Sequence, residues 1–291
     1  MKARHVKTVL KSLLPSRPIS PFRHKGLKST PEPLHLFSSE STHLWSGDYK
    51  SWEEVEEIAE GYNSDVILEK CKTALLKVKN GDAVYERDSV LFDQIQYSWP
   101  LLAGLQRAAS ENNGKLCVLD FGGSLGSSYY QNKDFLNTLS VLQWCVVEQK
   151  NFVDCGKKYF QDEELRFYPT VEECIFKYKP NVLILSSVLQ YLEKPYEWIE
   201  KFVALKIPYI IIDRTTFVKS ERDILTIQNV PEHIYQASYP AWFFNIDRFV
   251  NHFKNYSVLA SFDTHQGYVI HLENGLTSTY KGYILKCRDD S

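Results

Sequence analysis

The chain has 291 residues, of which 44% are hydrophobic, 14% aromatic and 24% charged. This composition describes a globular protein with one large core, or with one core and a smaller cap. The formal net charge of -2 gives no general attraction to nucleic acid, so no nucleic-acid partner is expected. No apolar run reaches the length of a membrane span and the N-terminus lacks the pattern of a secretory signal, so a cytoplasmic location is expected.

The cysteines indicate a reducing compartment and no zinc site. Six of them are spread along the chain without any CxxC pair, and several lie inside apolar runs where a thiol packs as a small hydrophobe. We therefore expect no metal.

Residues 1–43 are expected to form a basic N-terminal segment, because the first thirty residues contain no acidic side chain. Two interpretations stay open. Prolines beyond Leu14 favour a solvated tail, whereas VKTVLKSLL could form a basic helix peripheral to the inner face of a membrane or against a partner.

Residues 44–114 predict a helical cap. WEEVEEIAE carries acids in its first turn, residues 65–80 have near-helical apolar spacing, and a third helical pattern runs from Ser89 to Gly114 with a kink or restart at Pro100. The cap either covers one sheet edge or forms a wall of a substrate cavity lined by aromatic rings.

From residue 115 onwards strands and helices alternate, which predicts a parallel sheet covered by helices on both faces. The strands expected are KLCVLDF, VLQWCVVEQ, LRFYP, NVLILSSV and PYIIIDRT, followed by YSVLASFDT and YKGYILKCR as an antiparallel C-terminal pair. Residues 115–291 are thus expected to form one domain.

An insertion at about 216–245 interrupts this alternation. Pro231 and Pro240 break its periodicity, although it is rich in aromatic residues. We expect an irregular loop that is either a substrate lid or a segment packed on the sheet edge.

The stretch KLCVLDFGGSLGSSYY predicts a strand, a glycine-rich turn and a helix. Gly122 and Gly123 would let the chain turn sharply and leave room for a ligand, while Gly126 would let the helix pack close to the strand. Glu148 ends the next strand, where a carboxylate can accept hydrogen bonds from ribose hydroxyls. Together these residues describe a nucleoside pocket, the alternative being a solvated glutamate at a strand end.

The turn matches a dinucleotide fingerprint poorly, because the three glycine places hold Gly122, Ser124 and Ser127. Asp120, Gly122, Ser124 and Gly126 instead resemble the first motif of class I S-adenosylmethionine-dependent methyltransferases. In that family the acid helps to hold the amino-acid moiety of the cofactor. Two departures are Ser124 in place of the middle glycine and a longer interval between Asp120 and Glu148.

A second segment, LILSSVLQYLEKPYEWI, is similar to the fourth-strand region of the same family. The resemblance implies that Ser186, Ser187 and Gln190 face the cofactor, S-adenosylmethionine. It also implies an α/β, Rossmann-like class I methyltransferase fold. That fold is a mostly parallel seven-stranded sheet with an antiparallel C-terminal strand, preceded by a helical cap.

Residues 44–288 as a whole resemble a family of bacterial methyltransferases from surface-polysaccharide (lipopolysaccharide) gene neighbourhoods. The shared segments are VLDFGGSLGSSYYQN, WCVVEQ, SSVLQYLEKP, IIIDRT and VPEHIYQASYPAWFF, with WSGDY, AVYERDSVLFD and QYSWPLL. The resemblance implies O-methylation of a sugar or other small acceptor in glycan biosynthesis.

Methyl transfer to oxygen needs orientation and a general base. The catalytic candidates are His233, the first choice, Asp213 and Tyr239, and the substrate-binding candidates are Arg214, Tyr235 and Trp242. Two other classes stay open: a nicotinamide-dependent sugar oxidoreductase or epimerase, and a catalytically silent methyltransferase-like module that binds a partner through the aromatic block.

Overall fold

The computed structural model describes residues 44–59, 64–230, 237–264 and 269–288. The basic segment 1–43 therefore lies outside the described residues. Within the described ranges, no helix has the length and apolar character that crossing a membrane requires.

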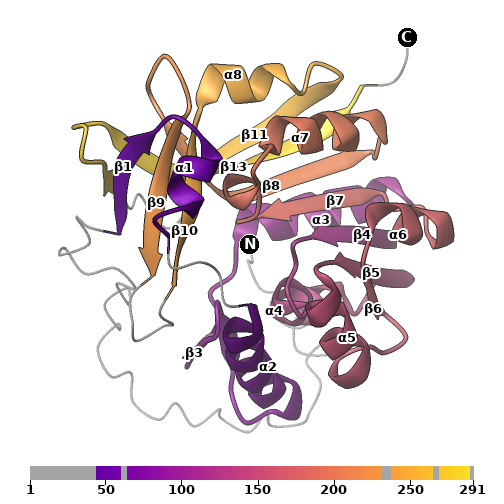
Figure 1. Cartoon of the computed structure of the whole chain (residues 1–291). Helices are drawn as coiled ribbons and strands as arrows, with labels where there is room; N and C mark the ends of the chain where they lie inside the picture. The colour runs from indigo at the N-terminus through magenta and orange to yellow at the C-terminus, as the bar shows by residue number, and fades with distance from the viewer. Residues whose placement is uncertain (1–43, 60–63, 231–236, 265–268, 289–291) are drawn as a thin grey trace, which may run out of the picture. The chain divides into compact units, whose positions relative to one another are not determined.

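A mostly parallel sheet forms the centre of the fold (Figure 1). From β6 to β8 all neighbouring strands are parallel, whereas β13 runs antiparallel to both β8 and β11. In spatial order the strands are β6 (Leu165–Tyr168), β5 (Val141–Val147), β4 (Lys115–Phe121), β7 (Val182–Ser186), β8 (Tyr209–Val218), β13 (Thr277–Cys287) and β11 (Tyr256–Asp263). The predicted α/β, Rossmann-like class I methyltransferase fold, with its antiparallel C-terminal strand, is confirmed, but the expected number of seven strands is wrong, because the sheet has eleven strands among the described residues.

Helices cover both faces of this sheet, because successive strand residues point to opposite sides. Val118 belongs to one apolar core and Leu119 to the other. The first core is closed by α2 (Ser64–Asn80), α3 (Trp99–Glu111), α4 (Ser127–Leu136) and α5 (Lys150–Tyr159), and the second by α6 (Val171–Lys177), α7 (Pro195–Ala204) and α8 (Ile246–Asn251).

The segment 216–245 extends the sheet, so the expectation of an irregular loop there is wrong for most of its length. It forms β9 (Ile224–Val230) and β10 (Ala237–Asn245), an antiparallel pair with Phe243 and Phe244 fully buried. β10 pairs with β8 only at Phe244 and Asn245, so among the described strands one edge of β10 has no partner at Pro240. Proline has no backbone N–H to donate, so a strand tolerates it at such an edge. β1 (Trp45–Tyr49) adds to β9, and β12 (Val269–His271) adds to β13.

The region before β4 is helical only in part. Its helices are α1 (Trp52–Glu56), α2 and α3, but the helical pattern expected from Ser89 is wrong before Trp99. A hairpin of β2 (Tyr85–Arg87) and β3 (Val90–Phe92) occupies part of that stretch, and α3 begins with Pro100 in its first turn. Proline suits that position because an amide donor there has no partner within the helix.

Candidate functional site

The strand order reverses between β4 and β7. The chain passes from β4 to β5 and β6 on one side and then returns to β7 on the other side of β4. In open α/β sheets ligands bind beyond the carboxyl ends of the strands at such a reversal. The residues that follow β4, β5, β7 and β8 are therefore the candidate site.

The glycines after β4 are required by protein packing. A Cβ atom at Gly122 would lie 2.5 Å from Cγ2 of Val188, and one at Gly123 would lie 2.5 Å from the carboxyl carbon of Asp120. Side chains of this chain thus occupy the place of a Cβ atom at both glycines, and their contact with a ligand stays a prediction. Gly126 has φ +97°, and its Cβ would lie 3.0 Å from Leu165 at the start of β6. The expected close packing of the following helix on β4 stays a prediction.

Glu148 follows β5 and turns back towards the glycine-rich turn. Its carboxylate accepts a hydrogen bond from the backbone amide of Gln149 at 2.6 Å, and the backbone of Ser124 also hydrogen-bonds to it. Burial raises the pKa of Glu148, while the two backbone contacts oppose the rise. Ser124 is held in the left-handed region, with φ +53°.

Asp120 lies at the end of β4 and is 1% exposed. Its Oδ2 accepts a hydrogen bond from Nε1 of Trp144, on the neighbouring strand β5, at 2.9 Å. Burial raises the pKa of Asp120 to about 7, and the charge of Glu148 adds to the rise. The sequence motif thus delivers a carboxyl group that is buried and exchanges its proton near neutral pH.

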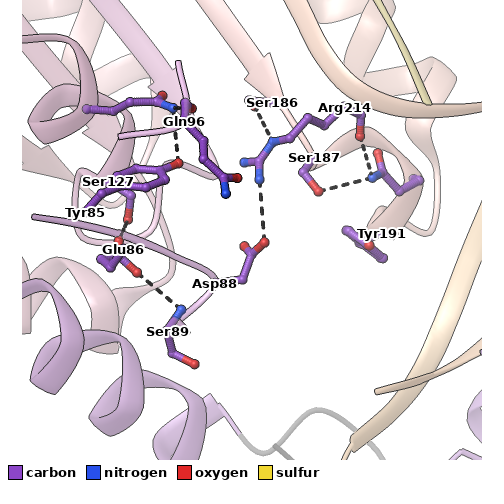
Figure 2. A network of polar contacts seen from close by, with 12 residues as sticks. Tyr85, Glu86, Asp88, Ser89, Gln96, Ser127, Ser186, Ser187, Tyr191 and Arg214 are labelled. Carbon is purple, nitrogen blue, oxygen red and sulfur yellow. Dashed lines mark hydrogen bonds and ion pairs between the residues drawn. The ribbon is translucent and has the colours of Figure 1, made fainter. Parts of the chain in front are cut away.

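The β2–β3 hairpin reaches across this edge, as Figure 2 shows. Glu86, 2% exposed, accepts a hydrogen bond from the hydroxyl of Ser127 in the first turn of α4, and its other oxygen accepts one from the amide of Ser89 at 3.2 Å. Burial raises the pKa of Glu86 to about 7. Gln131 of α4 donates to the hydroxyl of Tyr85 at 3.1 Å, so two contacts fix the hairpin to α4.

Sequence reasoning missed Glu86, although a signal was present. Two three-residue segments, Tyr-Glu-Arg and Val-Leu-Phe, flank Asp88-Ser89, and a two-residue connection between short strands predicts a tight hairpin. Asp88 and Ser89 have φ values of +52° and +68°, as the tight turns of hairpins require.

The three residues predicted after β7 lie together. The side-chain amide of Gln190, in the 3-10 helix η2 (Leu189–Tyr191), donates to the hydroxyl of Ser187 at 3.3 Å and to the carbonyl of Arg214 at 3.1 Å. Gln190 is 1% exposed, and among the described residues its Oε1 has no hydrogen-bond partner. An unpaired buried acceptor is costly, which makes this oxygen a candidate contact for a ligand.

A β-bulge at the end of β8 presents Asp213 and Arg214. Ile212 pairs with Tyr283 and Thr215 pairs with Lys281, so two residues of β8 lie opposite the single Gly282 of β13. Bulges of this kind redirect side chains and are enriched near active sites. Here the bulge holds Arg214 at φ +50°, a conformation that an arginine rarely adopts.

Asp213 is 3% exposed, and its Oδ1 has no hydrogen-bond partner within the described ranges. Burial raises its pKa, against the opposing charge of Arg214. The Nε of Arg214 donates to Oγ of Ser186 at 3.3 Å, and its Nη1 lies 3.5 Å from Oδ2 of Asp88 across the site (Figure 2).

The aromatic candidates are divided. The ring of Tyr239 packs edge-on against Tyr191, with centroids 5.4 Å apart, and the hydroxyl of Tyr191 donates to Gln228 at 3.0 Å. Tyr191 follows Gln190 directly, so Tyr239 lies close to the residues after β7. His233 and Tyr235 lie outside the described residues.

Trp242 lies elsewhere, in a surface hollow of about 710 Å³ that it lines together with Arg222 and Arg248. It stacks on Trp52 and donates its indole N–H to the carbonyl of Leu192 at 3.1 Å. Both arginines of the hollow are paired with aspartates, at 2.6 and 3.0 Å. A second hollow of about 780 Å³ lies between α7 and α8. The residues that line the two hollows do not include the glycine-rich turn, so both hollows are separate from the candidate site at the strand ends.

Metal ligands do not cluster at the site. Among the described residues, no group of three or more His, Cys, Asp and Glu side chains could hold a metal ion.

No family model and no curated protein matches the chain, so the narrower resemblance to surface-polysaccharide methyltransferases gains no support there. Solved S-adenosylmethionine-dependent methyltransferases are similar in fold. The N-terminal domain of EvdMO1, solved with S-adenosylhomocysteine bound, is 10% identical, with 70% of this chain and 90% of that chain covered and a TM-score of 0.41.

Two further structures are equally distant. The 1,6-didemethyltoxoflavin-N1-methyltransferase of Burkholderia thailandensis is 12% identical, over 84% of this chain and 93% of that chain, with a TM-score of 0.39. An S-adenosylmethionine-dependent methyltransferase from Clostridium acetobutylicum is 10% identical, with 65% of this chain and 91% of that chain covered and a TM-score of 0.41. Such distant likenesses identify neither the cofactor nor the acceptor of this chain.

Proposed function

We propose that this protein is an S-adenosylmethionine-dependent methyltransferase that acts on a hydroxyl group of a sugar or another small acceptor. The observation that carries the proposal is the acidic lining of the carboxyl edge. Asp120, Glu148 and Glu86 come from three separate elements and gather around one glycine-rich turn. S-adenosylmethionine carries two positive charges, on its sulfonium and ammonium groups, and an acidic pocket favours both.

The same acids argue against a nicotinamide cofactor. A dinucleotide places its pyrophosphate at the N-terminus of the helix after the glycine-rich turn, where the backbone amides and the helix dipole favour negative charge. Here Glu86 hydrogen-bonds to Ser127 in the first turn of that helix, α4. A buried carboxyl group at this position would repel a pyrophosphate, whereas S-adenosylmethionine contains no phosphate.

Each cofactor candidate then has a role. Glu148 would accept hydrogen bonds from the ribose hydroxyls. Asp120, at the end of β4, would stabilise the positively charged ammonium group of the amino-acid moiety through its negative charge. Ser186, Ser187 and Gln190 would border the cofactor on the β7 side, with the unpaired Oε1 of Gln190 as an acceptor for it.

When bound, the cofactor supplies an electrophilic methyl group, and the protein has to orient the acceptor and remove a proton. Among the described residues, Asp213 best fits the base: it is buried, one of its oxygens is unpaired, and burial raises its pKa. It would accept the proton that the acceptor hydroxyl loses. Arg214 and Tyr239 would contact the acceptor, and His233 stays the alternative base.

The acceptor class, a sugar in surface-glycan assembly, rests on the family resemblance described above. A cytoplasmic location is part of the same proposal.

Calorimetric titration with S-adenosylhomocysteine tests the proposal. We expect binding by the full chain, and a loss of roughly tenfold to a hundredfold in affinity for Glu148→Gln, the size of one or two hydrogen bonds to a charged group. Glu163→Gln is the matched control, because it removes the same charge from an exposed loop position.

The proposal fails if the full chain does not bind S-adenosylhomocysteine, or if Glu148→Gln binds it as tightly as the control does. A far-ultraviolet circular dichroism spectrum of each variant establishes that the fold is intact before affinities are compared.

A further inference from the structure

The guanidinium of Arg214 is a half-buried cation with few partners. Its side chain is 20% exposed, and among the described residues it makes one hydrogen bond, to Ser186 at 3.3 Å, and one ion pair, to Asp88 at 3.5 Å. A guanidinium carries five N–H donors and matches a carboxylate or phosphate through two parallel hydrogen bonds. Most of that capacity is unused here.

The backbone holds this side chain in place at a cost. Arg214 stands in the bulge of β8 at φ +50°, a conformation that glycine adopts without strain and other residues do not. Strain of this kind gathers at sites where a side chain has to be aimed.

Asp88 is a weak partner for Arg214. It lies in the turn of the β2–β3 hairpin, its side chain is 65% exposed, and both Asp88 and its neighbour Ser89 have positive φ, at +52° and +68°. An ion pair with so exposed a carboxylate contributes little, and solvent competes for it. Figure 2 shows Asp88 as the carboxylate nearest to the Arg214 guanidinium among the residues drawn.

We propose that Arg214 forms a subsite for a carboxylate or phosphate group on the acceptor, and that Asp88 occupies this subsite until the acceptor displaces it. The inference rests on the proposed function, because it assigns the charge of the molecule that is methylated. The acceptor is then an anionic sugar or a similarly small anion with a free hydroxyl. Displacing Asp88 releases the tip of the hairpin, while Glu86 and Tyr85 keep its base on α4.

Binding of paired probes tests the subsite. Glucuronate and glucose 6-phosphate are titrated against glucose at constant ionic strength, with the full chain saturated with S-adenosylhomocysteine. We expect both anions to bind more tightly than glucose. Asp88→Asn should tighten their binding by about twofold to fivefold, the size of the exposed ion pair that it removes.

Arg214→Gly is the complementary variant, since glycine fits the bulge and the fold is retained. It should weaken binding of the anions by roughly tenfold or more, down to the level of glucose. Asp93→Asn is the control for Asp88→Asn, because Asp93 is an exposed acid directly after β3 whose side chain makes no hydrogen bond or ion pair among the described residues. It should leave the anion affinities unchanged.

The inference is overturned if neither anion binds better than glucose, or if Arg214→Gly binds the anions as the wild type does. The proposed function is judged separately, by the affinity of the wild type and of Asp88→Asn for S-adenosylhomocysteine, which should be equal. Loss of cofactor binding in the wild type refutes the methyltransferase, whereas loss of anion selectivity alone refutes only the subsite.

Discussion

Replacing Glu86 by glutamine should make the protein relatively more stable as the pH rises. Glu86 is buried, and burial together with the charge of Asp88 raises its pKa from 4.5 to about 7, although hydrogen bonds from Ser127 and Ser89 oppose the rise. Between pH 4.5 and about pH 7, Glu86 is therefore protonated in the folded state, whereas it has already lost its proton in the unfolded state. Because of this difference, the contribution of Glu86 to stability is full below about pH 4.5 and is lost as the pH rises through 7.

The size of the effect follows from the two pKa values. A rise from 4.5 to about 7 corresponds to a loss of roughly 2 to 3 kcal/mol in the free energy of unfolding between pH 5 and pH 8. Asp120, whose pKa is also raised to about 7, contributes a loss of the same sign in the same range. Glutamine resembles the protonated acid in shape and in hydrogen bonding. Glu86→Gln should therefore remove the pH-dependent loss of stability that Glu86 causes and leave the loss that Asp120 causes.

Urea unfolding of the wild type and Glu86→Gln at pH 5, 6, 7 and 8 measures this difference. The stability of the variant relative to the wild type should increase steadily across the series, by roughly 2 to 3 kcal/mol in total. Glu163→Gln, at an exposed position, should run parallel to the wild type. Parallel curves for Glu86→Gln, or a difference that shrinks with pH, would refute the idea that Glu86 is buried with a raised pKa.

Two further outcomes are expected at the same edge of the sheet. The affinity for S-adenosylmethionine relative to S-adenosylhomocysteine should increase between pH 6 and pH 8, because Glu86 and Asp120 become charged in this range and only S-adenosylmethionine carries a sulfonium. Calorimetry at several pH values measures the ratio of the two affinities. A ratio that does not change with pH would contradict the acidic lining. Trp144→Phe should destabilise the fold by about 1 to 3 kcal/mol in urea unfolding, and more at pH 8 than at pH 5. The reason is that the variant lacks the indole hydrogen bond, 2.9 Å long, to the buried carboxyl group of Asp120. Trp45 is also buried, so Trp45→Phe is the comparison for the loss of ring volume.

The sheet could be predicted from the sequence because its signals are local. Each parallel strand is a short apolar run bounded by turn residues, and the intervening amphipathic segments are long enough to serve as crossover helices. The ends of those runs also located Asp120, Glu148 and Ser186 at one edge, since the carboxyl ends of parallel strands lie on the same side. These predictions needed no knowledge of which strands are neighbours.

What was missed depends on contacts between distant residues. YIIIDRTTFV has the pattern of one continuous strand, and the bulge at Arg214 exists only against Gly282, 68 positions further along the chain. Likewise, Pro240 predicts a loop until the pairing of β10 is known. The packing at the glycines could not be predicted for the same reason, because only the fold shows that Val188 lies where a Cβ atom of Gly122 would be.

Backbone strain and buried charge coincide at the candidate site. Seven non-glycine residues of the described chain have positive φ, and five of them, Asp88, Ser89, Ser124, Ser187 and Arg214, lie along the carboxyl edge of the sheet. Each left-handed residue costs about 1 to 2 kcal/mol, and the buried acids of this edge cost stability at neutral pH as well. The hairpin turn accounts for the positive φ of Asp88 and Ser89, whereas packing alone favours neither the other three left-handed residues nor the buried acids. Because two independent costs gather at the place where the strand order reverses, this edge is better explained by ligand binding than by the requirements of the fold.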